Sequence, residues 1–142
     1  MTEITDKAET VPTNQTDVIV ADSSRMPWET FLVPQTGAEL PSKSLFSDPD
    51  TGMQVMMLRY AAGFTNTWHT HPHAHGMYVL DGVLNTHRGQ YGPGNFVWFP
   101  EGGWMEHGAT ADNDVTFLFI TNKPFGIVYA SDDDQPYPMF DA

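Results

Sequence analysis

The sequence predicts an all-β protein, folded as a sandwich or barrel. Its 142 residues contain 12 glycines and 11 prolines at short intervals, which favours many short strands joined by turns. Apolar runs recur at roughly 8–12-residue spacing, as expected of such folds. No segment has sustained helical periodicity. The length suits one domain with a real core and leaves little room for a second.

The expected strands follow the apolar runs in chain order. They cover residues 28–33, 53–60, 76–80, 83–88 and 95–99, a run that begins at His107, and residues 115–120 and 125–129. Asp81-Gly82 predicts a hairpin between the third and fourth runs. Residues 37–49 are expected to form a loop, residues 89–94 a turn, and residues 18–21 a short edge strand.

The ends of the chain differ from its middle. Residues 1–24 are rich in Thr, Asp, Glu, Asn and Gln, which predicts a flexible N-terminal tail. Residues 25–130 hold the expected barrel. Residues 131–142 begin with Ser-Asp-Asp-Asp and are expected to form a C-terminal surface arm.

Composition excludes several kinds of function. The chain has no cysteine, so disulfides, thiolate ligands and a cysteine nucleophile are ruled out. Its formal net charge of −12 argues against nucleic acid and anionic membranes as partners. No apolar run approaches the roughly 20 residues of a membrane span. The polar N-terminus lacks the pattern of a signal peptide, and the expected location is therefore cytoplasmic.

Four of the six histidines lie within seven residues, two positions apart. Side chains two apart on a strand point to the same face, so His69 and His71 predict a shared metal site. His75 follows Pro72 and could turn back toward the same ion, whereas His73 is expected to be exposed. Because one strand cannot surround an ion, a distant ligand is needed; His107 is the best candidate and His87 the other.

The spacing of these residues resembles the two motifs of the cupin superfamily. Gly63, five residues, His69-x-His71, three residues, His75, six residues and Gly82 resemble the first motif, with His75 where the family usually has Glu. Gly94, five residues and Pro100-x-Gly102 resemble the second. Its histidine normally follows two residues later, and here His107 ends a loop about two residues longer.

The resemblance implies a single cupin jelly-roll β-barrel with a metal inside, bound by His69, His71, His75 and His107. The chain is similar to small all-histidine cupins that bind manganese or iron. It is also similar to iron dioxygenases that cleave acetylacetone or dihydroxyacetophenone and use three histidines. In that version His69, His71 and His107 are the ligands and His75 stands beside them. The family also implies a homodimer formed by exchange of N-terminal strands.

The predicted function is that of a metal-dependent dioxygenase that cleaves a small diketone, hydroxyketone or phenolic substrate. Fe(II) is the first choice of metal and Mn(II) the second, while Ni(II), Cu(II) and Zn(II) also suit histidine ligands. Partners are then a small-molecule substrate and O₂. Glu106 and His87 are the catalytic candidates. Alternatively, Glu106 is a solvated charge on a loop and His87 an ordinary strand residue.

Three further questions stay open on the sequence. Arg59 and Arg88 could orient an anionic substrate or simply stand on the surface. The ion could act only as a Lewis acid in an isomerase or lyase. The protein could also be a non-catalytic sensor of a metal or small ligand, although no basic region or helix-turn-helix accompanies the barrel.

Overall fold

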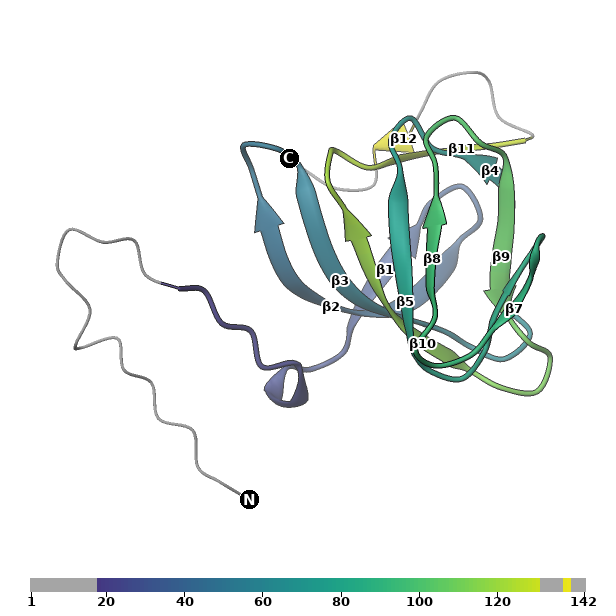
Figure 1. The fold of residues 1–142 in the computed structure, drawn as a ribbon, viewed down its shortest axis with the longest axis horizontal. Coiled ribbons are helices and arrows are strands. Elements are labelled where there is room, and N and C mark those ends of the chain that lie inside the picture. The colour runs from purple at the N-terminus through teal and green to yellow at the C-terminus, as the bar shows by residue number, and fades with distance from the viewer. Residues whose placement is uncertain (1–17, 131–136, 139–142) are drawn as a thin grey trace, which may run out of the picture.

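The computed structural model describes residues 18–130 and 137–138, and these form two six-stranded antiparallel sheets packed face to face (Figure 1). The first sheet has the order β1-β2-β3-β10-β5-β8 and the second β12-β11-β4-β9-β6-β7. The first sheet is built from β1 (Glu29–Val33), β2 (Ala38–Asp48), β3 (Met53–Tyr60), β5 (His75–Asp81), β8 (Phe96–Phe99) and β10 (Val115–Thr121). The second is built from β4 (Thr65–Thr70), β6 (Leu84–Thr86), β7 (Gly89–Tyr91), β9 (Met105–Ala109), β11 (Gly126–Tyr129) and β12 (Tyr137–Pro138). The predicted all-β jelly-roll is confirmed.

Alternation decides which side chains enter the core. In β3 and β10 every second residue is buried, and cross-strand partners such as Phe117 and Leu58 face inward together. Phe117 is fully buried at the centre of this layer. The core is apolar and continuous between the sheets, and it comprises Val33, Leu40, Met56, Leu58, Tyr60, Met77, Val79, Leu84, Phe99, Met105, Ala109, Val115, Phe117, Phe119, Phe125, Ile127 and Tyr129.

The predicted hairpin at Asp81-Gly82 is wrong. β5 pairs with β10 and β8 in the first sheet, whereas β6 pairs with β9 and β7 in the second. The turn therefore carries the chain from one sheet to the other. Gly82 has φ 82°, and a Cβ there would lie 2.0 Å from the Asp114 carbonyl oxygen, so both the turn and the packing require glycine.

Three other local predictions are corrected. Residues 37–49 contain the 11-residue strand β2 rather than a loop, because pairing with β1 and β3 outweighs the proline and serines in this run. β7 occupies residues expected to form a turn. Residues 18–21 form no strand, and Val18, Ile19 and Val20 are 76–79% exposed. Of the expected C-terminal arm, residues 137–138 form β12, which pairs with β11, and the other residues of the arm lie outside the described part of the chain.

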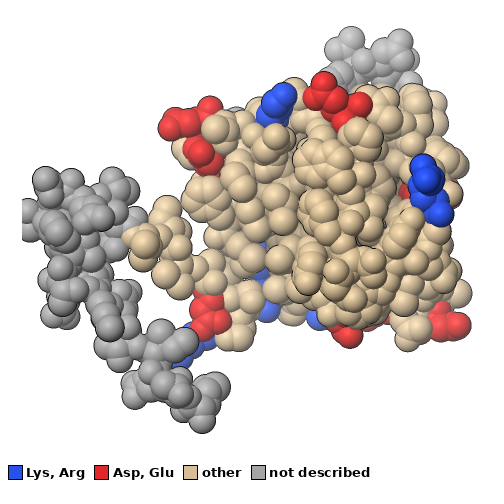
Figure 2. All heavy atoms as spheres, viewed as in Figure 1, with Lys and Arg blue, Asp and Glu red and all other residues tan. Residues whose placement is uncertain are grey.

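The outer face of the first sheet is largely uncharged. Strands β3, β10, β5 and β8 cross the front of the molecule in Figure 1, and in the same view Figure 2 shows charged side chains mainly near the margins. The cross-strand row Met57, Leu118, Tyr78 and Phe96 lies on this face. Tyr78 is 39% and Phe96 53% exposed, so the described part of the chain leaves a broad apolar surface open to solvent.

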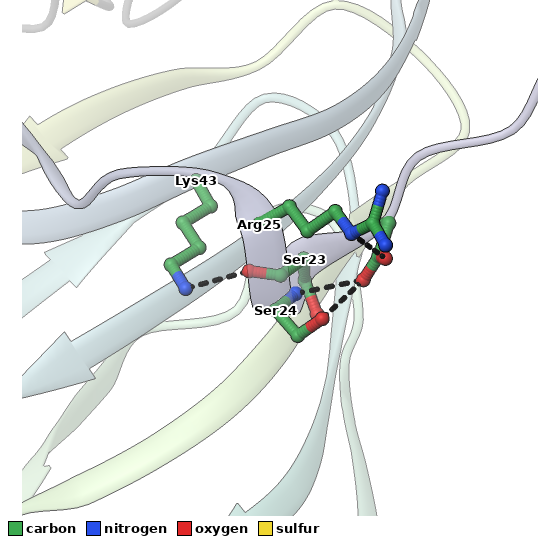
Figure 3. A network of polar contacts seen from close by, with 5 residues as sticks. Ser23, Ser24, Arg25 and Lys43 are labelled. Atoms are coloured by element: carbon green, nitrogen blue, oxygen red, sulfur yellow. Dashed lines mark hydrogen bonds and ion pairs between the residues drawn. The ribbon is translucent and has the colours of Figure 1, made fainter. Parts of the chain in front are cut away.

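The segment before β1 is fixed to β2 by one short turn. The 3₁₀ helix η2 (Ser23–Arg25) is capped by Asp22, which accepts a hydrogen bond from the Ser24 backbone N–H. Lys43 on β2 donates from Nζ to the Ser23 carbonyl over 2.7 Å (Figure 3). Lys43 also lies over the ring of Trp28. No helix in the described part of the chain has the length and apolar character needed to cross a membrane.

Candidate metal centre

Three histidines, two from adjacent strands of the second sheet and one from the residue that follows β4, meet in the core. His69 lies in β4 and His107 in the adjacent strand β9, while His71 follows the end of β4. Each of the three is at most 2% exposed. The pair His69 and His71 and the distant residue His107 therefore come together as predicted, in a buried group that we call the three-histidine cluster.

A bulge in β4 shapes this arrangement. Asn66 pairs with His107 and His69 pairs with Met105. A step of three positions along β4 therefore faces a step of only two positions along β9, so β4 carries one extra residue here. The extra residue lets Asn66 and His69 both face inward although they are an odd number of positions apart. His71 then follows with the normal two-residue period, and its ring centroid lies 4.8 Å from that of His69.

The spacing of the ring nitrogens fits one transition-metal ion. One nitrogen from each of the three rings lies within 4.8 Å of those of the other two. The Nε2 atoms of His69 and His107 are 3.1 Å apart. Two nitrogens bound at right angles to an ion at about 2.1 Å are separated by about 3.0 Å, which agrees with this distance. The residues present therefore fit a metal ion held by three imidazoles.

Hydrogen bonds orient the rings for this task. His69 donates from Nδ1 to the Thr67 carbonyl oxygen over 2.5 Å, and His71 donates from Nδ1 to the Gly126 carbonyl oxygen. With the proton fixed on Nδ1, the Nε2 lone pair of each neutral ring is free to bind a cation. The Nδ1 of His107 instead lies 3.1 Å from the Tyr60 hydroxyl.

Burial keeps these rings neutral. Desolvation lowers the pKa of His69 to about 4 and that of His71 to about 3, with nearby His69 adding to the second effect. Desolvation also holds the pKa of His75 and of His107 well below the usual value, with smaller contributions from the other histidines. Neutral imidazole is the form that binds metals, so the cluster is ready to accept an ion at pH 7.

His75 stands beside the three-histidine cluster without completing it. It begins β5, on the opposite sheet, and its ring centroid is 4.6 Å from that of His71 and 6.1 Å from that of His107. Its ring stacks on Phe99, and neither ring nitrogen has a hydrogen-bond partner among the described residues. Two unpartnered buried nitrogens are costly, and a fourth bond to an ion or to its bound ligand would relieve one of them. That His75 is a fourth ligand to the ion stays a prediction.

A small cavity of about 30 Å³ adjoins the histidines. This volume holds one or two water-sized groups. His71, His75 and His107 are among its lining residues, and most of the others are apolar, namely Phe31, Val33, Leu40, Leu58, Phe119, Phe125 and Ile127. A larger substrate must displace part of this apolar wall.

The two catalytic candidates lie outside the cavity. Glu106 is the neighbour of His107 in β9, so strand alternation turns its side chain to the other face of the sheet. His87 is exposed, and its backbone N–H donates to the Glu106 carbonyl oxygen. Neither residue lines the cavity. The structure therefore does not bring Glu106 or His87 to the cluster.

The remaining sequence candidates also face outward. His73, expected to be exposed, is half-buried: its side chain is 36% exposed and lies 3.8 Å from the Glu101 carboxylate. Arg59 donates to the Thr116 hydroxyl and lies over the ring of Trp28. Arg88 is exposed next to His87. None of the three lines the cavity.

Sequence reasoning missed two polar residues of the cavity, Tyr60 and Asn66. The alternation of β3 predicts an inward side chain at Tyr60, but nothing in the sequence links it to His107, 47 positions away. Asn66 was hidden by the bulge, because a regular strand would turn it away from the face of His69.

The fold and the inward cluster define the class: an all-β jelly-roll with histidines inside the barrel is a cupin. The model of the family described as the ChrR cupin-like domain matches residues 16–126, so the chain belongs to this family. No curated protein matches the chain.

Solved structures of differing function share this fold. A "putative acetylacetone dioxygenase" from Methylibium petroleiphilum is 12% identical, with 92% of this chain and 95% of that chain covered and a TM-score of 0.71. A "putative sugar phosphate isomerase" from Acidithiobacillus ferrooxidans is 26% identical over 75% of each chain, with a TM-score of 0.57. Rhodobacter sphaeroides SigE in complex with the anti-sigma ChrR is 16% identical, with 70% of this chain and 51% of that chain covered and a TM-score of 0.56.

Proposed function

We propose that this chain is a metal-dependent dioxygenase that cleaves a small diketone, hydroxyketone or phenolic substrate. The observation that carries the proposal is a buried cluster of three neutral histidines beside an apolar cavity. The fold similarity to the Methylibium protein supports it. Fe(II) is the first choice of metal, because it suits imidazole ligands and leaves coordination positions open, and Mn(II) is the second.

The cluster contributes no negative charge. A divalent ion held by neutral imidazoles therefore keeps its full charge, with which it would bind an enolate and bring O₂ next to it. O₂ is the oxidant in this reaction, and one of its atoms ends on each carbon of the broken carbon–carbon bond. The chain's own part is to hold the ligands, exclude water through the apolar wall and orient the substrate.

Oxygen uptake tests the proposal directly. Protein loaded with Fe(II) under anaerobic conditions is given O₂ and a panel of β-diketones and aromatic hydroxyketones. We expect uptake that depends on substrate, that is lost in His71→Ala and that persists in His73→Ala, the same change two residues away and outside the cluster. Absence of uptake across the panel with metal bound would overturn the dioxygenase proposal.

The same panel separates the two alternatives. Turnover without O₂ would indicate an isomerase or lyase that uses the ion as a Lewis acid, the class suggested by the name of the Acidithiobacillus protein. Tight binding of a metal or small ligand without turnover would indicate a non-catalytic protein such as a sensor; one structure of similar fold is that of the anti-sigma ChrR from Rhodobacter.

We also propose that the protein forms a homodimer through the outer face of the first sheet. In a chain of net charge −12, like-charge repulsion opposes self-association, and this face lacks charge where Met57, Leu118, Tyr78 and Phe96 meet. The exposed apolar residues Val18, Ile19 and Val20 could extend the contact. Light scattering after size exclusion should give a mass twice that of one chain for the wild-type protein. The Phe96→Glu variant should give the mass of a single chain. A monomeric wild-type protein would contradict this.

A further inference from the structure

The wall of the cavity carries two polar side chains besides histidine. Among its described lining residues these are Tyr60 and Asn66, and all others except the three histidines are apolar. Tyr60 is 3% and Asn66 8% exposed. Among the described residues no Lys, Arg, Asp or Glu lines the cavity, so within this part of the chain a charge brought in by a ligand is balanced by an ion at the histidines or by hydrogen bonds from these two residues.

The direction of the Tyr60 hydrogen bond depends on His107. If His107 Nε2 donates to His69 Nε2, its Nδ1 is a lone pair and accepts the Tyr60 hydrogen over their 3.1 Å contact. If Nε2 binds an ion, the proton of the neutral ring sits on Nδ1 and is donated to the Tyr60 oxygen. The Tyr60 O–H then needs a different acceptor. Because Tyr60 lines the cavity, a ligand in the cavity could supply that acceptor.

Asn66 is oriented by a different partner. Tyr129 donates from its hydroxyl to Asn66 Oδ1 over 2.6 Å, in a contact that is buried. This bond occupies the acceptor end of the amide and leaves the two N–H groups of Nδ2 as its donors. Asn66 lies opposite His107 in the β4–β9 ladder, so it stands on the same face of the sheet as the cluster.

We propose that Tyr60 and Asn66 are the hydrogen-bond donors for an oxygen atom of a small anionic ligand bound beside the three-histidine cluster. The ligand class is an oxyanion, either an enolate or a carboxylate, and Tyr60 turns toward it when His107 holds an ion. Neutral donors in an apolar surrounding stabilise a localised negative charge strongly, because little solvent competes for it. This inference rests on the proposed metal-dependent function.

Binding of formate to Co(II)-loaded protein tests the proposal without turnover. Formate is a small oxyanion suited to the small cavity, and Co(II) reports ligand binding through its visible absorption. The variants are Tyr60→Phe, which keeps the ring packed between Phe64 and Phe117, and Tyr78→Phe, which removes a hydroxyl from the outer face. Cobalt content, measured for each protein, is brought to one per chain by excess metal.

We expect the formate Kd to rise about tenfold or more in Tyr60→Phe and to stay within about twofold in Tyr78→Phe, since a hydrogen bond to a charged group is lost only in the first. Asn66→Asp keeps an acceptor for Tyr129 but puts a carboxylate oxygen in place of the amide donor. It should raise the formate Kd at least as much as Tyr60→Phe does. Equal formate affinity in Tyr60→Phe and wild type, with cobalt bound in both, would overturn the role of Tyr60 and leave the metal site standing. Failure of the wild type to bind cobalt would overturn both proposals.

Discussion

The two sheets carry different kinds of residue on their inner faces. The first has the longer strands, with 11, 8, 7 and 7 residues in β2, β3, β5 and β10, and its buried side chains are mostly apolar, with Ser42, Gln54, His75 and Thr121 as polar exceptions. The second has shorter strands, with 6, 5, 3 and 3 residues in β4, β9, β6 and β7, and its inner face presents Asn66, His69 and His107. The first sheet therefore supplies most of the long apolar strands and the second supplies His69 and His107 of the three-histidine cluster, while Tyr60 and His75 reach the cavity from the first. Substitutions should separate the two.

The largest effect on stability is expected from Phe117→Ala in the first sheet. Phe117 is fully buried between β3 and β5, and truncation of a buried phenylalanine costs about 3–5 kcal/mol of unfolding free energy. Urea denaturation should show this loss. Leu118→Ala, one residue along on the outer face, is the matched control and should cost clearly less. Equal losses would contradict the assignment of the core to the inner face.

Acid should destabilise the metal-free protein through the histidines. The pKa of His69 is about 4 and that of His71 about 3, both below the usual 6.5, so the unfolded chain binds protons that the folded chain does not. Their contribution is complete above pH 6.5 and is lost as pH falls toward 4 and 3. We expect a loss on the order of 3 kcal/mol from His69 alone. Denaturation between pH 7.5 and 4.5 measures it, and a flat profile in wild type would count against buried neutral rings.

In the second sheet, His69→Ala should affect metal binding more than folding. Loss of a partner that merely orients a ligand costs about 10–100-fold in metal affinity, so loss of a ligand should cost more than about 100-fold. Competition with a chelator gives the affinity. His87→Ala, outside the cavity, is the control and should bind metal as the wild type does. Similar losses in both variants would place the site elsewhere.

The smallest effect is expected from Glu106→Gln. This side chain points away from the cavity although it adjoins His107. Metal affinity and oxygen uptake should therefore stay within about twofold of wild type, since surface substitutions away from a site have little effect. A loss of activity with metal still bound would restore Glu106 as a catalytic candidate.

Sequence patterns predicted the parts of this molecule that depend on local spacing. The strand at Met53–Tyr60 follows from its apolar run, and the His69–His71 pair follows from the two-residue period of a strand. The pairing of strands could not be predicted in this way. The sequence Asp81-Gly82 is the same whether the turn joins two neighbouring strands of one sheet or carries the chain from one sheet to the other. β2 was missed because its proline and serines weaken the local signal, while its pairing with two neighbours is not local. Tyr60 and Asn66 needed the register between distant strands and a bulge.

The neutral histidine cluster in a strongly acidic chain has a kinetic consequence. At long range the net charge of −12 attracts divalent cations and repels anionic substrates, whereas close to a bound ion the attraction reverses. Added salt screens the long-range field over about 10 Å at 0.1 M. Salt should therefore slow metal uptake and speed the arrival of an anionic substrate, and stopped-flow measurements at two ionic strengths would show opposite slopes for the two steps.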